Sequence, residues 1–192
     1  MADGKQRSLR KLLDSRLARE EIPRFVAEMQ GMHDRAVGVL AATLVEDALE
    51  HLMLARMTKL TRDEYQALFQ GTSPLSTFSA RIRVSRAFKV IGKAQMLDMA
   101  LIKDIRNVFA HSRLPISFQT REISERVQKI GIIKTFIQAG ALLKMMGNDL
   151  AEEANFASFD QRDPRIRYIL SCALYDQMLR LSPHDPDFDE DE

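Results

Sequence analysis

Residues 37–52, VGVLAATLVEDALEHL, carry an apolar pattern with the period of a helix. Their apolar side chains recur three and four positions apart, at Val37, Leu40, Ala41, Leu44, Val45, Ala48 and Leu52. Side chains with this spacing share one face of an α-helix. We therefore expect a helix over about residues 34–57, with its apolar stripe centred on Leu44.

Similar spacing and capping signals predict helices on both sides of this one. The first covers residues 8–30 with a break at Pro23, and Thr61 opens a short helix because TRDE is a capping box. Further helices are expected from Ser76 or Thr77 to about residue 90, over 95–110, and over 123–146 with a stop at Gly147-Asn148. Asp163-Pro164 starts the last one, which reaches about residue 181.

These elements predict an all-α protein. The chain has 192 residues with only 8 Gly and 6 Pro, which favours helix over sheet. No alternating strand pattern is longer than residues 116–118, and no linker separates two domains. We expect a single-domain helical bundle of about seven helices over residues 1–182, followed by an acidic, disordered tail over 183–192.

Charge is unevenly distributed, although the net charge is only +1. Residues 65–97 contain no acid but include the bases Arg81, Arg83, Arg86, Lys89 and Lys93. Four of these, Arg83, Arg86, Lys89 and Lys93, are the candidate surface for a protein partner or for a nucleic-acid backbone, whose contacts weaken with salt. They are called the basic patch below.

The single cysteine, Cys172, lies in an apolar helical stretch and is expected to be a core residue in a reducing compartment. The first residues lack an apolar signal core, and the apolar run 130–146 is interrupted by Lys134, Gln138 and Lys144. We therefore expect a cytoplasmic protein with no membrane contact.

Three expected helices carry charged or histidine side chains near their apolar faces. Asp47 and His51 lie within about 60° of Leu44 in projection, Arg81 lies beside Phe78 and Ile82, and Arg106 lies near Ile102 and Phe109. A buried charge without a partner is costly. We expect Arg81 or Arg106 to reach Asp47, or its neighbours Glu46 and Glu50, in a structural polar network of Asp47, His51, Arg81 and Arg106. A ligand or catalytic pocket is the alternative.

Residues 105–111, IRNVFAH, place Arg106, Asn107 and His111 close together in sequence. In an unbroken helix Asn107 and His111 share a face, but Arg106 and His111 lie roughly 140° apart. They converge only if the helix ends before His111 or if a second subunit supplies one of them. A histidine at a helix end more often caps free carbonyl groups.

Several functional signatures are absent from the sequence. The four histidines are scattered without metal-ligand spacing, and there is no phosphate-binding Gly-rich loop and no nucleophile elbow, so neither a metal nor a cofactor is expected. Residues 61–70 and 76–90 come nearest to a helix-turn-helix. Their GTSPL loop is unlike its tight turn, and the second helix has a core-facing stripe.

Two stretches together resemble the mannitol operon repressor family. They are LFQGTSPLSTFSARI, residues 68–82, and LIKDIRNVFAHS, residues 101–112, within a similar region spanning about 35–145. The family's Gly-Pro is extended here to Gly71-Thr-Ser-Pro74. Where the family tends to have an aromatic residue and a glycine, this chain has Arg86 and Lys89.

The resemblance implies an all-α fold and a repressor of sugar-alcohol uptake genes. Members lack a conventional DNA-reading motif, which implies action through protein partners such as a transcription complex. Under this interpretation the protein is not an enzyme.

The Arg-x4-His pattern of residues 106–111 also resembles the HEPN helical superfamily, some of whose members are metal-independent, dimeric ribonucleases. That resemblance implies His111 as general base for a 2′-hydroxyl, Arg106 as the group that stabilises phosphorane charge, and Asn107 as the group that positions the phosphate. This is the alternative function, and it requires a homodimer.

Overall fold

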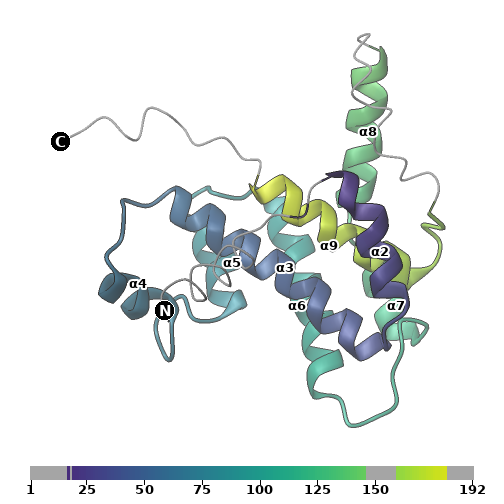
Figure 1. Cartoon of the computed structure of the whole chain (residues 1–192), viewed down its shortest axis with the longest axis horizontal. Helices are drawn as coiled ribbons and strands as arrows, with labels where there is room; N and C mark the ends of the chain where they lie inside the picture. The colour runs from purple at the N-terminus through teal and green to yellow at the C-terminus, as the bar shows by residue number, and fades with distance from the viewer. Residues whose placement is uncertain (1–16, 18, 146–158, 181–192) are drawn as a thin grey trace, which may run out of the picture.

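Two helices, α3 (Asp34–Ala55) and α9 (Pro164–Arg180), pack along each other at the centre of the protein in the computed structural model (Figure 1). The structure describes residues 17, 19–145 and 159–180. Within these ranges every regular element is a helix, so the all-α prediction is confirmed. Helix α9 is buried on nearly all sides, including its polar residues Ser171, Asp176 and Gln177.

The other helices surround this pair. Helix α6 (Lys93–His111) packs on α3, α5 (Phe78–Ala87) packs on both α3 and α6, and α2 (Ile22–Gln30) packs on α9 after a short 3-10 turn, η1 (Arg19–Glu21). Helix α7 (Arg121–Gln128) contacts α6 and α9. Figure 1 shows α4 (Arg62–Phe69) at one edge of the molecule and α8 (Ile132–Met145) projecting from the other side.

Aromatic side chains fill the space where α3, α6 and α9 meet. The ring centroid of Phe118 lies 4.7 Å from that of Phe109 and 5.2 Å from that of Tyr168. The Tyr168 hydroxyl donates to the Gly38 carbonyl over 3.0 Å. A Cβ atom on Gly38 would lie only 2.2 Å from the Phe109 ring, so the absence of a side chain there allows the ring to touch the α3 backbone.

Local capping signals are confirmed where the sequence predicted them. The Thr61 and Glu64 side chains form a reciprocal capping box at the start of α4. Thr77 rather than Ser76 caps α5, and its hydroxyl accepts from Ala80 N over 3.2 Å. Helix α9 begins at Pro164.

The expected long helix over residues 123–146 is wrong, because the chain breaks at Gly131 into α7 and α8. The Asp98 carboxylate on α6 accepts hydrogen bonds from the backbone amides of Gly131 and Ile132 at the start of α8. A side chain distant in sequence therefore satisfies amides that a continuous helix would have bonded internally. The expected Gly147-Asn148 stop, the acidic tail and residues 8–16 and 18 of the first expected helix lie outside the described residues.

The expected centre of the α3 stripe is also wrong. Leu44 is half-buried and Leu40 is 45% exposed, whereas the small residues Ala41, Ala42 and Ala48 are fully buried around Val45. Moving the centre from Leu44 to Val45 rotates the buried face by about 100°. This rotation decides which polar residues of α3 meet the neighbouring helices.

Candidate functional site

Arg81 on α5 reaches two acids of α3. Its Nη2 lies 2.7 Å from Glu50 Oε2 and its Nη1 lies 3.7 Å from Glu46 Oε1. Its Nε donates to the Leu75 carbonyl over 2.8 Å, and its guanidinium lies over the Phe69 ring at 5.7 Å. Arg81 is only 7% exposed, so these partners replace the water that a guanidinium would otherwise bind.

Arg106 on α6 joins the same network less tightly. Its Nη2 lies 3.5 Å from Glu46 Oε2, and its side chain is 33% exposed. Its Nε is buried and has no hydrogen-bond partner among the described residues. Glu46 therefore bridges two arginines from two different helices.

Glu50 links the network to α4. The Tyr65 hydroxyl donates to Glu50 Oε1 over 2.6 Å, and partial burial together with the Glu50 carboxylate raises the pKa of Tyr65. The tyrosine ring also stacks on Phe69. Helices α3, α4, α5 and α6 thus converge on one pair of carboxylates.

Asp47 and His51 do not join this network. Both are exposed on α3, because the buried face is rotated away from the expected position. Partial desolvation by the surrounding helices and the negative charges of Glu46 and Glu50 nevertheless raise the pKa of Asp47, and the charges of Arg180 and Arg81 oppose this rise. The expected ion pairs of Arg81 and Arg106 therefore form with Glu46 and Glu50, the neighbours of Asp47 that were also expected, and the described residues show no ion pair of Asp47 or His51 with either arginine.

Helix α6 continues without a break through His111. Arg106 and His111 are therefore separated by about 140° around the helix and do not converge in one protomer. Arg106 is turned towards Glu46, while His111 is exposed and Asn107 is half-buried. A single copy of the chain does not assemble these three residues into a catalytic site.

Arg35, which the sequence interpretation missed, binds the end of α6. Its Nη1 donates to the Phe109 carbonyl over 2.9 Å and its Nη2 donates to the Leu114 carbonyl over 2.7 Å. These are free carbonyl groups of the kind that His111 was expected to cap. The partners are distant in sequence, so no local signal identified Arg35.

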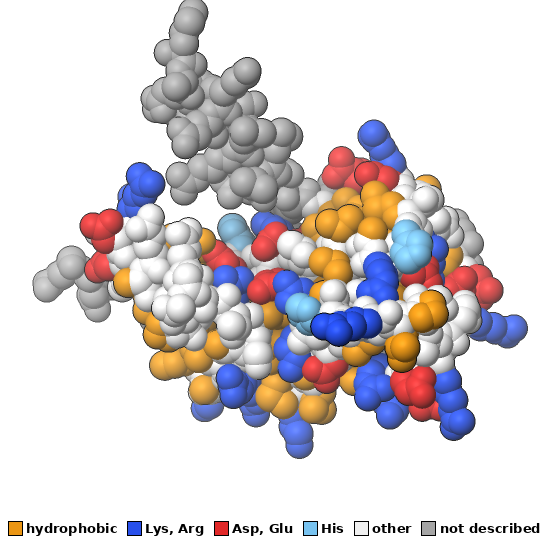
Figure 2. All heavy atoms as spheres, turned by 90° about the horizontal axis from the view of Figure 1, so that it is seen from below, with side chains coloured by type: hydrophobic (Ala, Val, Ile, Leu, Met, Phe, Trp, Pro, Cys, Tyr) orange, Lys and Arg blue, Asp and Glu red, His pale blue; other side chains and the backbone are white. Residues whose placement is uncertain are grey.

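The basic patch lies where α5 ends and α6 begins. Arg83, Lys89 and Lys93 are exposed and Arg86 is half-buried. Next to them Phe88 is 79% exposed, an unusual position for a large aromatic side chain. Figure 2 shows that hydrophobic side chains also lie between lysines and arginines on the face that it displays.

Lys89 has a backbone conformation that usually belongs to glycine. Its φ is +59°, and the amides of Val90 and Lys89 donate to the carbonyls of Ser85 and Arg86. This is the Schellman pattern that ends many helices, with a left-handed residue where glycine is favoured. A lysine side chain is therefore retained at a strained position.

Neither a metal site nor a reactive thiol is found in the described part of the chain. Residues 17, 19–145 and 159–180 contain no group of three or more His, Cys, Asp or Glu side chains able to hold a metal ion. The Cys172 thiol is fully buried, as the sequence predicted, and burial raises its pKa. None of the described helices has the length and hydropathy needed to cross a membrane.

Comparison of the chain with protein-family models, with curated proteins and with solved structures finds no match.

Proposed function

We propose that this protein is a non-enzymatic regulator that restrains transcription of sugar-alcohol uptake genes, of the mannitol type, and that it acts by binding a protein partner through the basic patch. The sequence motifs of residues 68–82 and 101–112 support the regulatory class. The single observation that carries the binding role is the strained, exposed Lys89.

The left-handed conformation costs a residue with a side chain about 1 kcal/mol relative to glycine. Nothing in the fold requires the Lys89 side chain, which is exposed. The family that the sequence resembles tends to have glycine in this part of the helix. A lysine that lowers stability is best explained by a use for its charge.

The chemistry of the patch favours an acidic partner with an apolar group. Phe88 lies two residues after Arg86 and directly before Lys89. Leu97 is 51% exposed and lies one helical turn after Lys93. An aromatic side chain flanked by cations is typical of interaction surfaces. Binding should therefore weaken, but not disappear, as salt is raised.

Direct reading of DNA is less well supported. Helices α4 and α5 are separated by residues 70–77, which exceeds the tight turn of a helix-turn-helix. The buried side of α5, with Phe78, Arg81, Ile82 and Ser85, packs on the core. These features support a regulator that acts through another protein.

The test is complementation of a strain that lacks this protein. A variant with Arg83→Glu, Lys89→Glu and Lys93→Glu reverses the exposed charges of the patch. The matched control, Arg56→Glu, Lys59→Glu and Arg62→Glu, reverses the same number of exposed charges around the α3–α4 loop. We expect the patch variant to lose repression of sugar-alcohol uptake transcripts and the control to keep it. Equal repression by both would contradict the proposal.

A second candidate function, a metal-independent ribonuclease, is favoured by one observation. Val108 and Leu114 are 40% and 70% exposed on either side of His111 in the chain, as expected if a second copy covers this end of α6. A homodimer is then needed to bring Arg106 of one protomer near His111 of another. Purified protein should cleave structured RNA without metal and His111→Ala should not; equal RNA decay in both samples excludes this function.

A further inference from the structure

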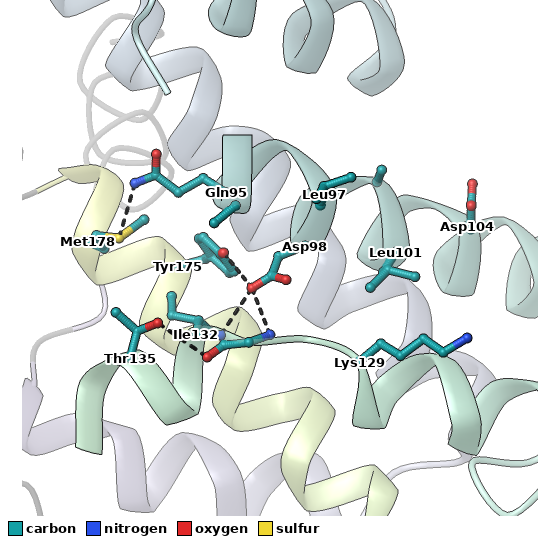
Figure 3. Close-up of a pocket in the computed structure, with 13 residues that line it drawn as sticks. Gln95, Leu97, Asp98, Leu101, Asp104, Lys129, Ile132, Thr135, Tyr175 and Met178 are labelled. Atoms are coloured by element: carbon teal, nitrogen blue, oxygen red, sulfur yellow. Dashed lines mark hydrogen bonds between the residues drawn. The ribbon is translucent and has the colours of Figure 1, made fainter. Parts of the chain in front are cut away.

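A groove of about 690 Å³ lies between α6, the start of α8 and α9 (Figure 3). Its walls are mostly apolar and include Ala94, Leu97, Leu101, Ile132 and Met178. The volume lies within the range of sites for small organic ligands. The groove is separate from the ion pairs of Arg81 and Arg106.

One carboxylate lies on the floor of this groove. Asp98 is 8% exposed, and its Oδ2 accepts from Tyr175 Oη, Gly131 N and Ile132 N over 2.8, 2.9 and 3.0 Å. Its Oδ1 accepts no hydrogen bond from the described residues. In Figure 3 this second oxygen points away from the three donors, towards the side of the groove where Leu101 lies.

The two oxygens therefore have different roles. Oδ2 joins α6 to α8 and α9, and its three donors keep the carboxylate fixed. Oδ1 opens into the mostly apolar groove and is not one of the buried side-chain atoms that lack a partner, so solvent reaches it. A ligand that brings a charged donor to this oxygen replaces water with a charge-assisted hydrogen bond.

The charges around the groove favour a cation. Asp104 adds a second acid to the lining, but Lys103 Nζ lies 3.0 Å from its Oδ1. Asp98 is therefore the acid available to a ligand, against the single lining base Lys129. Arg167 lies near Asp98: burial lowers the pKa of this arginine, and the charge of Asp98 partly opposes that effect. Its Nη2 nevertheless donates to the Ile130 carbonyl over 2.9 Å and its Nε donates to the Val127 carbonyl over 3.4 Å. These bonds direct its charge towards the end of α7.

We propose that this groove binds a small amine with an apolar body. The ammonium group donates to Asp98 Oδ1, and the apolar body packs on Leu97, Leu101 and Met178. A charge-assisted hydrogen bond in a partly enclosed site gives a clear preference for the ammonium over an uncharged group of the same shape. This inference does not rest on the proposed regulatory function.

The experiment uses three probes of similar shape: 4-phenylbutylamine, 4-phenylbutanol and 4-phenylbutyrate. Calorimetry or amide chemical shifts measure their binding to the full chain. We expect the amine to bind about tenfold tighter than the alcohol, which corresponds to one good charged hydrogen bond, and the carboxylate to bind weakest. Asp98→Asn keeps the shape of the side chain and should abolish the preference for the amine. Equal binding of the three probes overturns the proposal.

A second variant covers the case in which Asp98→Asn does not fold, since Asp98 holds the start of α8. Thr135→Trp places a large side chain at an exposed position in the lining and should weaken amine binding more than about tenfold, while Gln119→Trp, an exposed residue outside the groove, should not. Unchanged amine binding by Thr135→Trp, with folding confirmed by circular dichroism, also overturns the proposal.

Discussion

The two ends of α5 carry basic side chains with opposite environments. Near the start, Arg81 is buried and contacts Glu46, Glu50 and the Leu75 carbonyl. At the end, Lys89 is exposed in a strained backbone conformation. The comparison shows that the type of residue alone does not indicate its role: Arg81 holds helices together, and Lys89 is exposed to solvent.

The difference also predicts how each end responds to change. Removing one member of a buried ion pair leaves the other charge without compensation, whereas an exposed charge is screened by water and salt. Substitutions at the start of α5 should therefore act on stability. Those at its end should act on binding.

Arg81→Ala should have the largest effect on stability. It removes the ion pair of Glu50 and leaves Glu46 with only the looser contact to Arg106, and we expect a loss of about 3–5 kcal/mol in the free energy of unfolding. Denaturant unfolding followed by circular dichroism measures it. A loss below about 1 kcal/mol would show that the network does not hold α5 on α3.

Arg81→Lys sharpens the same comparison, because it retains the charge but loses the planar fork. A lysine has no equivalent of the Nε bond to Leu75 and cannot span both glutamates as the guanidinium does. We expect a loss of about 1–2 kcal/mol, intermediate between wild type and Arg81→Ala. If Arg81→Lys unfolds at the same denaturant concentration as the wild type, the positive charge at position 81 alone accounts for the stabilisation.

Lys89→Gly should stabilise the protein. Glycine adopts the left-handed conformation without steric cost, so we expect a gain of about 1 kcal/mol. Lys89→Ala serves as the control, because it removes the charge but keeps the strain, and should leave stability within about 0.5 kcal/mol of wild type. An equal gain from both substitutions would mean that charge repulsion, rather than backbone conformation, destabilises this end.

Asp47→Asn should have the smallest effect, with a defined pH dependence. The pKa of Asp47 is raised, so its ionised form is less favourable in the folded state than in the unfolded state. The substitution should therefore stabilise the protein at pH 7 by about 0.5 kcal/mol, a figure limited by solvent screening of the exposed side chain. The gain should disappear as pH falls below the ordinary carboxyl pKa of about 4, because Asp47 is then protonated in both states. Unfolding measured from pH 3 to 7 checks this sign.

Local signals allowed much of the fold to be predicted. The capping residues Thr61 and Thr77 and the start at Pro164 depend on neighbouring residues only, and the structure confirms them. The α7–α8 break depends on Asp98, far away in the sequence, so no local pattern around Gly131 revealed it.

The rotation of α3 has a different physical cause. A pattern weighted by large apolar residues places the centre at Leu44, but α9 and α6 approach α3 closely where its side chains are small. Gly38, Ala41 and Ala48 are buried for this reason. The need to neutralise Arg81 and Arg106 was predictable from their positions, whereas the choice of Glu46 and Glu50 over Asp47 required the true orientation of the helix.

The most direct test of the central claim, that the basic patch serves binding at the expense of stability, is the repression level of Lys89→Gly in the strain that lacks this protein, with Lys89→Arg as the charge-retaining control. The account predicts that Lys89→Gly is more stable than wild type yet represses sugar-alcohol uptake transcripts less, while Lys89→Arg represses normally. Full repression by the stabilised Lys89→Gly variant would contradict it.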